Sequence, residues 1–99
     1  MNQQQQHAIA CYETLLESLA VLKSHLGQND DNAAHEAISV LLMQTGDLFG
    51  TQSVVMQQFF PVMDTIKQRI DAMQLQDALR QAELFDSQIR EIQTIIANG

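Results

Sequence analysis

Residues 75–96, LQDALRQAELFDSQIREIQTII, decide the fold class. Apolar side chains recur here every three or four residues, which is the spacing of one side of an α-helix that packs against other helices. They are Leu75, Ala78, Ala82, Phe85, Ile89, Ile92 and Ile96. No glycine or proline interrupts the stretch. The pattern therefore predicts an amphipathic helix.

A second apolar stripe precedes this one and is two residues out of phase with it. Its members are Phe59, Met63, Ile66, Ile70 and Met73. The apolar side therefore rotates near 73–75, through a real turn or through a stutter in one continuous helix. A continuous helix over 53–97 would be about 65 Å long at 1.5 Å per residue, which is too long for a compact domain of this size. We expect either an elongated bundle completed by a second copy or a break that gives four short helices.

Two further helices are expected in the first half of the chain. One covers about 4–26 and the other about 31–48, each with apolar residues at helical spacing. Gly27 is predicted to end the first in a left-handed conformation, and an Asp or Asn within 28–32 is predicted to cap the second. Gly50 is predicted to break the chain before the third segment, because glycine is costly inside a helix.

The third segment has a predicted cap and one proline. Thr51 or Ser53 is the expected N-cap, and Pro61 either lies in the first turns of this helix or kinks it. Residues 1–99 therefore form a single all-α domain, an antiparallel bundle of three to four helices. We expect it to be a homodimer.

Composition excludes several functions. The net charge is −7, with only five Lys and Arg, and a phosphate backbone requires clustered basic residues, so no nucleic acid is expected as a partner. No apolar run reaches the length that spans a bilayer, and residues 1–6 lack the basic and apolar parts of a signal peptide. Cys11 is the only cysteine, which fits a reducing compartment. We expect no membrane association and a cytoplasmic location.

Signatures of metal or cofactor binding are missing from the sequence. His7, His25 and His35 are not spaced as helical zinc ligands are, and no Gly-rich loop could hold a phosphate group. We therefore expect neither a metal ion nor a cofactor.

One polar pair could carry chemistry. Asp77 and Gln81 are four residues apart, so on a helix they share one face and could hold a water between them. The order Gln-Asp, three residues, Gln within residues 76–81 resembles the active-site helix of the chemotaxis phosphatase family CheZ. That resemblance, which covers about residues 73–92, implies that Gln81 would orient the attacking water and Asp77 would meet a lysine of the phosphorylated response regulator. Arg80 stands where the family usually has a small residue.

The methionines and phenylalanines suggest a different function. Small, acidic, Met- and Gln-rich helical chains resemble the flagellar export chaperones of the FliT and FlgN kind, which implies an apolar helical groove for a partner protein. Thioether side chains repack easily around different partners. The predicted partner-binding residues are Met56, Phe59, Phe60, Met63 and Met73.

Together these features predict a protein-interaction module, such as a small export or assembly chaperone, and not an enzyme. The partner is another protein that the sequence does not identify. The alternative is a CheZ-like phosphatase with Asp77 and Gln81 as catalytic residues.

Overall fold

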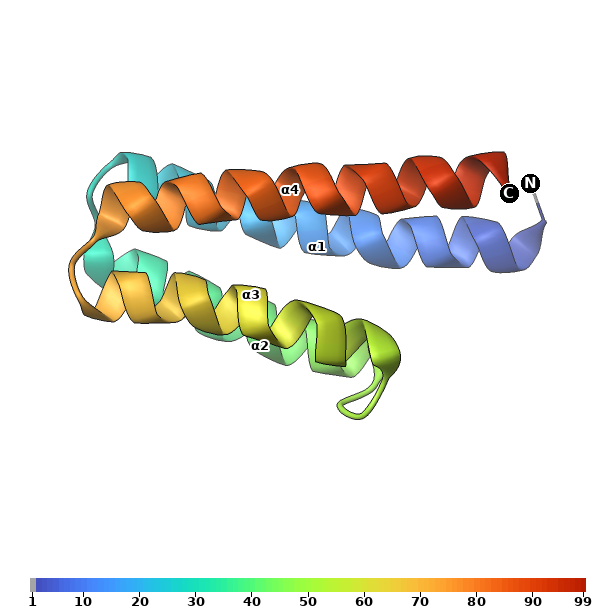
Figure 1. Cartoon of the computed structure of the whole chain (residues 1–99), viewed down its shortest axis with the longest axis horizontal. Coiled ribbons are helices and arrows are strands. Elements are labelled where there is room, and N and C mark those ends of the chain that lie inside the picture. The colour runs from blue at the N-terminus through green and yellow to red at the C-terminus, as the bar shows by residue number, and fades with distance from the viewer. Residues whose placement is uncertain (1) are drawn as a thin grey trace.

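A computed structural model describes residues 2–99 and folds them into four α-helices joined by short turns (Figure 1). The helices are α1 (Gln3–Gly27), α2 (Asp31–Phe49), α3 (Val54–Asp71) and α4 (Leu75–Asn98). Each helix packs along its neighbours in the sequence, and α4 also packs along α1. The result is an antiparallel bundle in which the start of α1 and the end of α4 lie at the same end of the molecule (Figure 1). The predicted all-α bundle is confirmed.

The chain breaks at 72–74, so the second of the two expected architectures is the one observed. Helix α3 ends at Asp71 and α4 begins at Leu75. The two apolar stripes differ in phase because they belong to separate helices, each of which turns its own stripe toward the core. The four helices enclose a core within a single chain.

Two of the turns have the same construction. The amide of Asp30 donates to the carbonyl of His25 at 3.0 Å, and the amide of Gln74 donates to the carbonyl of Arg69 at 2.8 Å. The residue before each of these amides is left-handed, with φ 57° at Asn29 and 59° at Met73. Both turns are therefore Schellman motifs, in which the left-handed residue lets the next amide reach back to the helix.

The prediction that Gly27 provides the left-handed stop is wrong. Gly27 is the last helical residue of α1, and Asn29 takes the left-handed conformation two residues later. Asparagine tolerates the left-handed conformation better than most residues, so α1 can continue through Gly27 before it ends. Gly50 does have a positive φ of 93° and ends α2 as predicted.

Side-chain caps begin α1, α2 and α3, and those of α2 and α3 lie where the sequence predicted them. The carboxylate of Asp30 accepts from the amide of Ala33 at 3.1 Å, and the hydroxyl of Ser53 accepts from the amide of Met56 at 3.0 Å. Pro61 lies inside α3, beyond its first turns, and the helix continues through it.

Side-chain size in the core follows the shape of the bundle. Toward the α2–α3 loop, α2 and α3 lean away from α1 and α4 (Figure 1). Aromatic rings occupy the wider part, where Phe59 packs edge-on against Phe85 at 5.0 Å between ring centroids and Tyr12 lies 4.9 Å from Phe49. Small buried residues such as Ala34 and Ala78 lie near the narrow end, where helices approach more closely.

Candidate functional site

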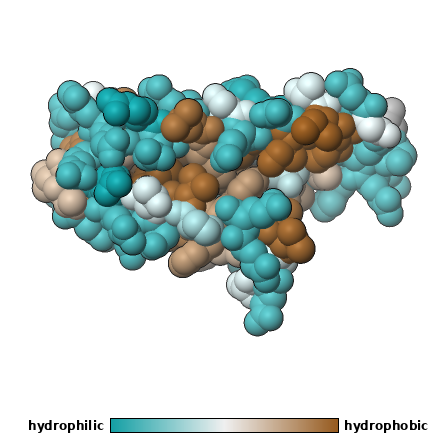
Figure 2. All heavy atoms as spheres, viewed as in Figure 1, coloured by the Kyte–Doolittle hydropathy of each residue, from teal (hydrophilic) through white to brown (hydrophobic). Residues whose placement is uncertain are grey.

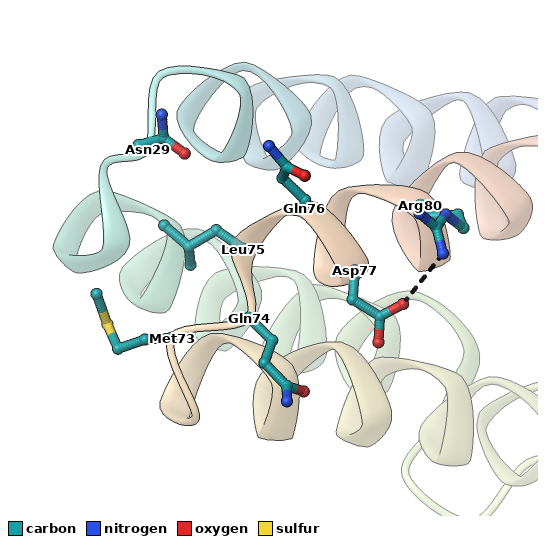
Figure 3. A pocket seen from close by; sticks show the side chains of 7 residues that line it. All are labelled: Asn29, Met73, Gln74, Leu75, Gln76, Asp77 and Arg80. Carbon is teal, nitrogen blue, oxygen red and sulfur yellow. Dashed lines mark ion pairs between the residues drawn. The ribbon is translucent and has the colours of Figure 1, made fainter.

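The pair singled out for catalysis lies near the start of α4. Asp77 is in its first turn, and its carboxylate oxygens lie 2.7 Å from Nε of Arg69 and 3.7 Å from Nη1 of Arg80. Figure 3 shows Asp77 and Arg80 side by side at the end of the bundle. The carboxylate is thus engaged with two cations, one from α3 and one from its own helix. A lysine of an incoming protein would have to compete with both.

Gln81 lies one turn further along α4, as the spacing predicted, but in a different setting. Its side chain is half-buried and borders a hollow between α3 and α4 together with Val62 and Leu84. Asp77 instead borders a polar pocket at the end of the bundle, next to Gln74 and Gln76. The two residues share a helix face, yet they border different surfaces.

The predicted partner-binding residues do not form one surface. Phe59 and Met63 lie in the core. Met56 and Phe60 remain accessible beside Pro61 and border a shallow hollow near the α2–α3 loop. Met73 is exposed in the turn at the opposite end of the molecule. The reason is the helical period, since adjacent positions such as 59 and 60 point about 100° apart on a helix with 3.6 residues per turn.

A surface that sequence reasoning missed runs between α3 and α4. Two adjoining hollows make it up, and they share Gln88 and Glu91. The first is also lined by Gln58 and Phe59 of α3 and by Ile92 and Ile95 of α4. The second is also lined by Val62 of α3 and by Gln81, Leu84, Phe85 and Ser87 of α4. We refer to these residues together as the α3–α4 groove.

Exposed apolar side chains stand along this groove. Leu84 is 59% exposed and Ile95 is 63% exposed. Figure 2 shows apolar residues gathering between α3 and α4 and along α4 on this face. Among the α4 residues that line the groove, one set recurs every three or four positions along the accessible side of the helix. It consists of Gln81, Leu84, Gln88, Glu91 and Ile95. Helix α4 therefore has an inner stripe that fills the core and an outer, partly apolar stripe that no other part of residues 2–99 covers.

A sequence signal for the outer stripe exists, although it is weak. Leu84 and Ile95 are apolar residues of α4 that fall outside the inner stripe, and they lie eleven positions apart, which is three helical turns. Two apolar residues among glutamines and a glutamate are too few to distinguish this face from an ordinary solvated one. Val62 of α3 also lines this surface, but it comes next to α4 only when the chain folds.

The charge of the groove is negative. Glu91 is the one ionisable residue among those that line it. The nearest cation in the sequence, Arg90, is engaged elsewhere, because its Nε lies 2.6 Å from a carboxylate oxygen of Asp86. Burial of Asp86 favours its neutral form, but hydrogen bonds from Lys23 and Arg90 prevail and lower its pKa below the usual value. The hydrogen bond between Arg90 and Asp86 also raises the pKa of Arg90 above its usual value.

The described residues contain neither a cluster of side chains that could bind a metal ion nor a helix that could span a membrane. Within 2–99, no three His, Cys, Asp or Glu side chains lie close enough together to hold a metal ion. None of α1 to α4 is both long and apolar enough to cross a membrane.

Comparisons of the chain with protein-family models, with curated proteins and with solved structures gave no match. We therefore infer the function from the chain's own residues and their arrangement.

Proposed function

We propose that this protein is a protein-interaction module, such as a small export or assembly chaperone, that binds its partner through the α3–α4 groove. One observation carries the proposal. Leu84 and Ile95 are both more than half exposed on the same face of α4, although the inner stripe of that helix already fills the core. Covering apolar side chains of this size releases free energy, and an exposed apolar stripe with a polar rim is typical of a protein-binding surface.

The state of Asp77 favours a binding module over a phosphatase. An aspartate that receives a lysine from a response regulator needs a free carboxylate, whereas Asp77 contacts Arg69 and Arg80. Gln81 is the one residue of the pair that borders the groove, and there it serves as polar rim. The same residues are thus accounted for by binding alone.

We place this activity in the cytoplasm. Cys11 is the only cysteine in the sequence, and it is buried in α1. A chain that uses no internal disulfide suits a reducing compartment.

The test is affinity capture with the tagged full-length chain from extract of the cells that make it, followed by mass spectrometry. The groove variant is Leu84→Gln/Ile95→Gln. Its matched control is Val40→Gln/Met43→Gln, which removes two apolar residues of similar exposure, 48% and 66%, from α2. Both double variants keep the net charge of the wild type. We expect one protein to be captured by the wild type and the control but lost with the groove variant.

Two results would overturn this proposal. The first is capture of the same protein by the wild type and by the groove variant in equal amount. The second is capture of a response regulator whose dephosphorylation is accelerated by the wild type and not by Gln81→Ala, which would establish the phosphatase. As a control, circular dichroism should show that each variant keeps the helix content of the wild type.

A further inference from the structure

We infer that the α3–α4 groove receives a single basic amphipathic helix of another protein. This inference rests on the proposed function and specifies the partner's chemistry. The occupant places apolar side chains against Leu84 and Ile95 and a Lys or Arg against Glu91. Three features of the groove carry the inference: its length, the spacing of its apolar residues, and its charge.

The length of the groove matches a short helix. From Gln81 to Ile95 the outer stripe of α4 extends about 21 Å at 1.5 Å per residue, so a straight helix of about 14 residues would cover it. The outer stripe repeats every three or four residues along its whole length. This is the period with which one helix contacts another that lies alongside it at a small angle, as in a coiled coil. An extended strand would find no unpaired backbone groups along the groove, because α3 and α4 already use their backbone groups in helical hydrogen bonds.

The charge of the groove selects a basic partner. Glu91 lies on the outer stripe between Leu84 and Ile95, so a helix that covers both of them also covers Glu91. A carboxylate covered by apolar atoms alone would lose hydration without compensation. No other groove-lining side chain is a cation, so the partner must supply one. The net charge of −7 attracts a basic helix from a distance as well.

The charge of the groove also disfavours a second copy of this chain as the occupant. Two chains that met groove to groove would cover two Glu91 carboxylates, and neither groove offers a cation to the other. Each chain also carries a net charge of −7, so their association is opposed at longer range. The homodimer expected from the sequence therefore does not form through this face.

Synthetic helical peptides of about 18 residues, long enough to cover the groove, provide the test. All three have the same leucines at heptad spacing, and their remaining positions carry mainly Lys, mainly Gln or mainly Glu. Binding of each labelled peptide to the full chain is measured by fluorescence anisotropy at near-physiological salt. The protein variants are Leu84→Gln/Ile95→Gln and Glu91→Gln. The control for charge is Glu83→Gln, which removes an equal charge from an exposed position of α4 outside the groove.

We expect the Lys peptide to bind at least about tenfold more tightly than the Glu peptide, with the Gln peptide between them. Leu84→Gln/Ile95→Gln should weaken the Lys peptide about tenfold or more. Glu91→Gln should weaken it about two- to fivefold, the range of a partly exposed ion pair, and Glu83→Gln by less than about twofold.

The outcomes separate the inference from the proposed function. If all three peptides bind equally well and all are weakened by Leu84→Gln/Ile95→Gln, the groove is a binding site but its partner need not be basic, and only the inference is overturned. If Glu91→Gln and Glu83→Gln weaken the Lys peptide equally, the attraction is general and the inference also fails. If light scattering detects a dimer of the wild type that the groove variant abolishes, the occupant is a second copy. Failure of the affinity capture, by contrast, removes the proposed function itself.

Discussion

Nζ of Lys23 lies 2.9 Å from a carboxylate oxygen of Asp86 and joins α1 to α4. Nε of Arg90 lies 2.6 Å from the other oxygen of the same carboxylate. Asp86 is buried, whereas both cations are partly accessible. These three side chains therefore link α1 to α4. The buried carboxylate of Asp86 depends on Lys23 and Arg90 to compensate for its lost hydration.

Replacing Asp86 with alanine should lower the free energy of unfolding by about 1–3 kcal/mol, because hydrogen bonds to a charged group are lost and Lys23 keeps its charge without a partner. Urea unfolding followed by circular dichroism measures the change. Glu83→Ala, at an exposed position of the same helix, should change the stability by less than about 0.5 kcal/mol. Equal effects of the two substitutions would contradict the role given to Asp86.

The stabilisation by Asp86 should also depend on pH. Its pKa in the folded state is lowered, so the unfolded state binds the proton more readily. The contribution is therefore fully present above the unfolded pKa of about 3.9 and is lost as the pH falls through the lower, folded pKa. Urea unfolding of the wild type and Asp86→Asn between about pH 6 and about pH 2.5 should give a stability difference that is constant at first and shrinks below about pH 4. A difference that stays constant to the acid limit would show that charge is not involved.

The two Schellman turns allow a direct exchange of residues. Asn29 and Met73 have nearly the same φ, 57° and 59°, but methionine has no side-chain group that favours the left-handed conformation. Met73→Asn should raise the free energy of unfolding by about 0.5–1 kcal/mol, and Asn29→Met should lower it by a similar amount. Thermal and urea unfolding of both variants test this. Met73 is exposed, so lost packing does not complicate the comparison, and a loss of stability in Met73→Asn would be the contrary result.

Pro61 provides a prediction about helix α3. It lies inside the helix and lacks the amide hydrogen that would donate to the carbonyl of Gln57. Its side chain is exposed, so Pro61→Ala removes little packing. We expect this variant to be more stable by about 1–2 kcal/mol, the helical gain being reduced by the greater freedom of its unfolded chain. If thermal unfolding finds it less stable, the proline has a packing role that its exposure does not indicate.

The fold could be predicted from the sequence because the apolar stripes are long and their period is unambiguous. The shift of phase near 73–75 indicated where the apolar side rotates, although it left a turn and a stutter both open. An Asp or Asn within 28–32 and Thr51 or Ser53 indicated where two of the helices start. The site could not be predicted in the same way. Helix α3 is apolar at both 59 and 60. The apolar stripe that includes Phe59 indicates which of the two turns inward, but the partner-binding prediction was based on composition and included both. The α3–α4 groove combines residues from two helices, so it becomes visible only when their relative rotation is known.

The adjacent phenylalanines of α3 test this distinction between core and surface. Phe59 is 4% exposed and packs against Phe85, whereas Phe60 is 49% exposed. Phe59→Ala should lower the free energy of unfolding by about 3–5 kcal/mol, because it leaves a cavity among the aromatic rings. Phe60→Ala should lower it by less than about 1 kcal/mol, since an exposed side chain loses few contacts. Urea unfolding gives both values. Phe60→Ala should remain folded, so any loss of partner capture by this variant would reflect a change in binding and not in folding. Two variants of equal stability would mean that α3 is rotated relative to the arrangement described above.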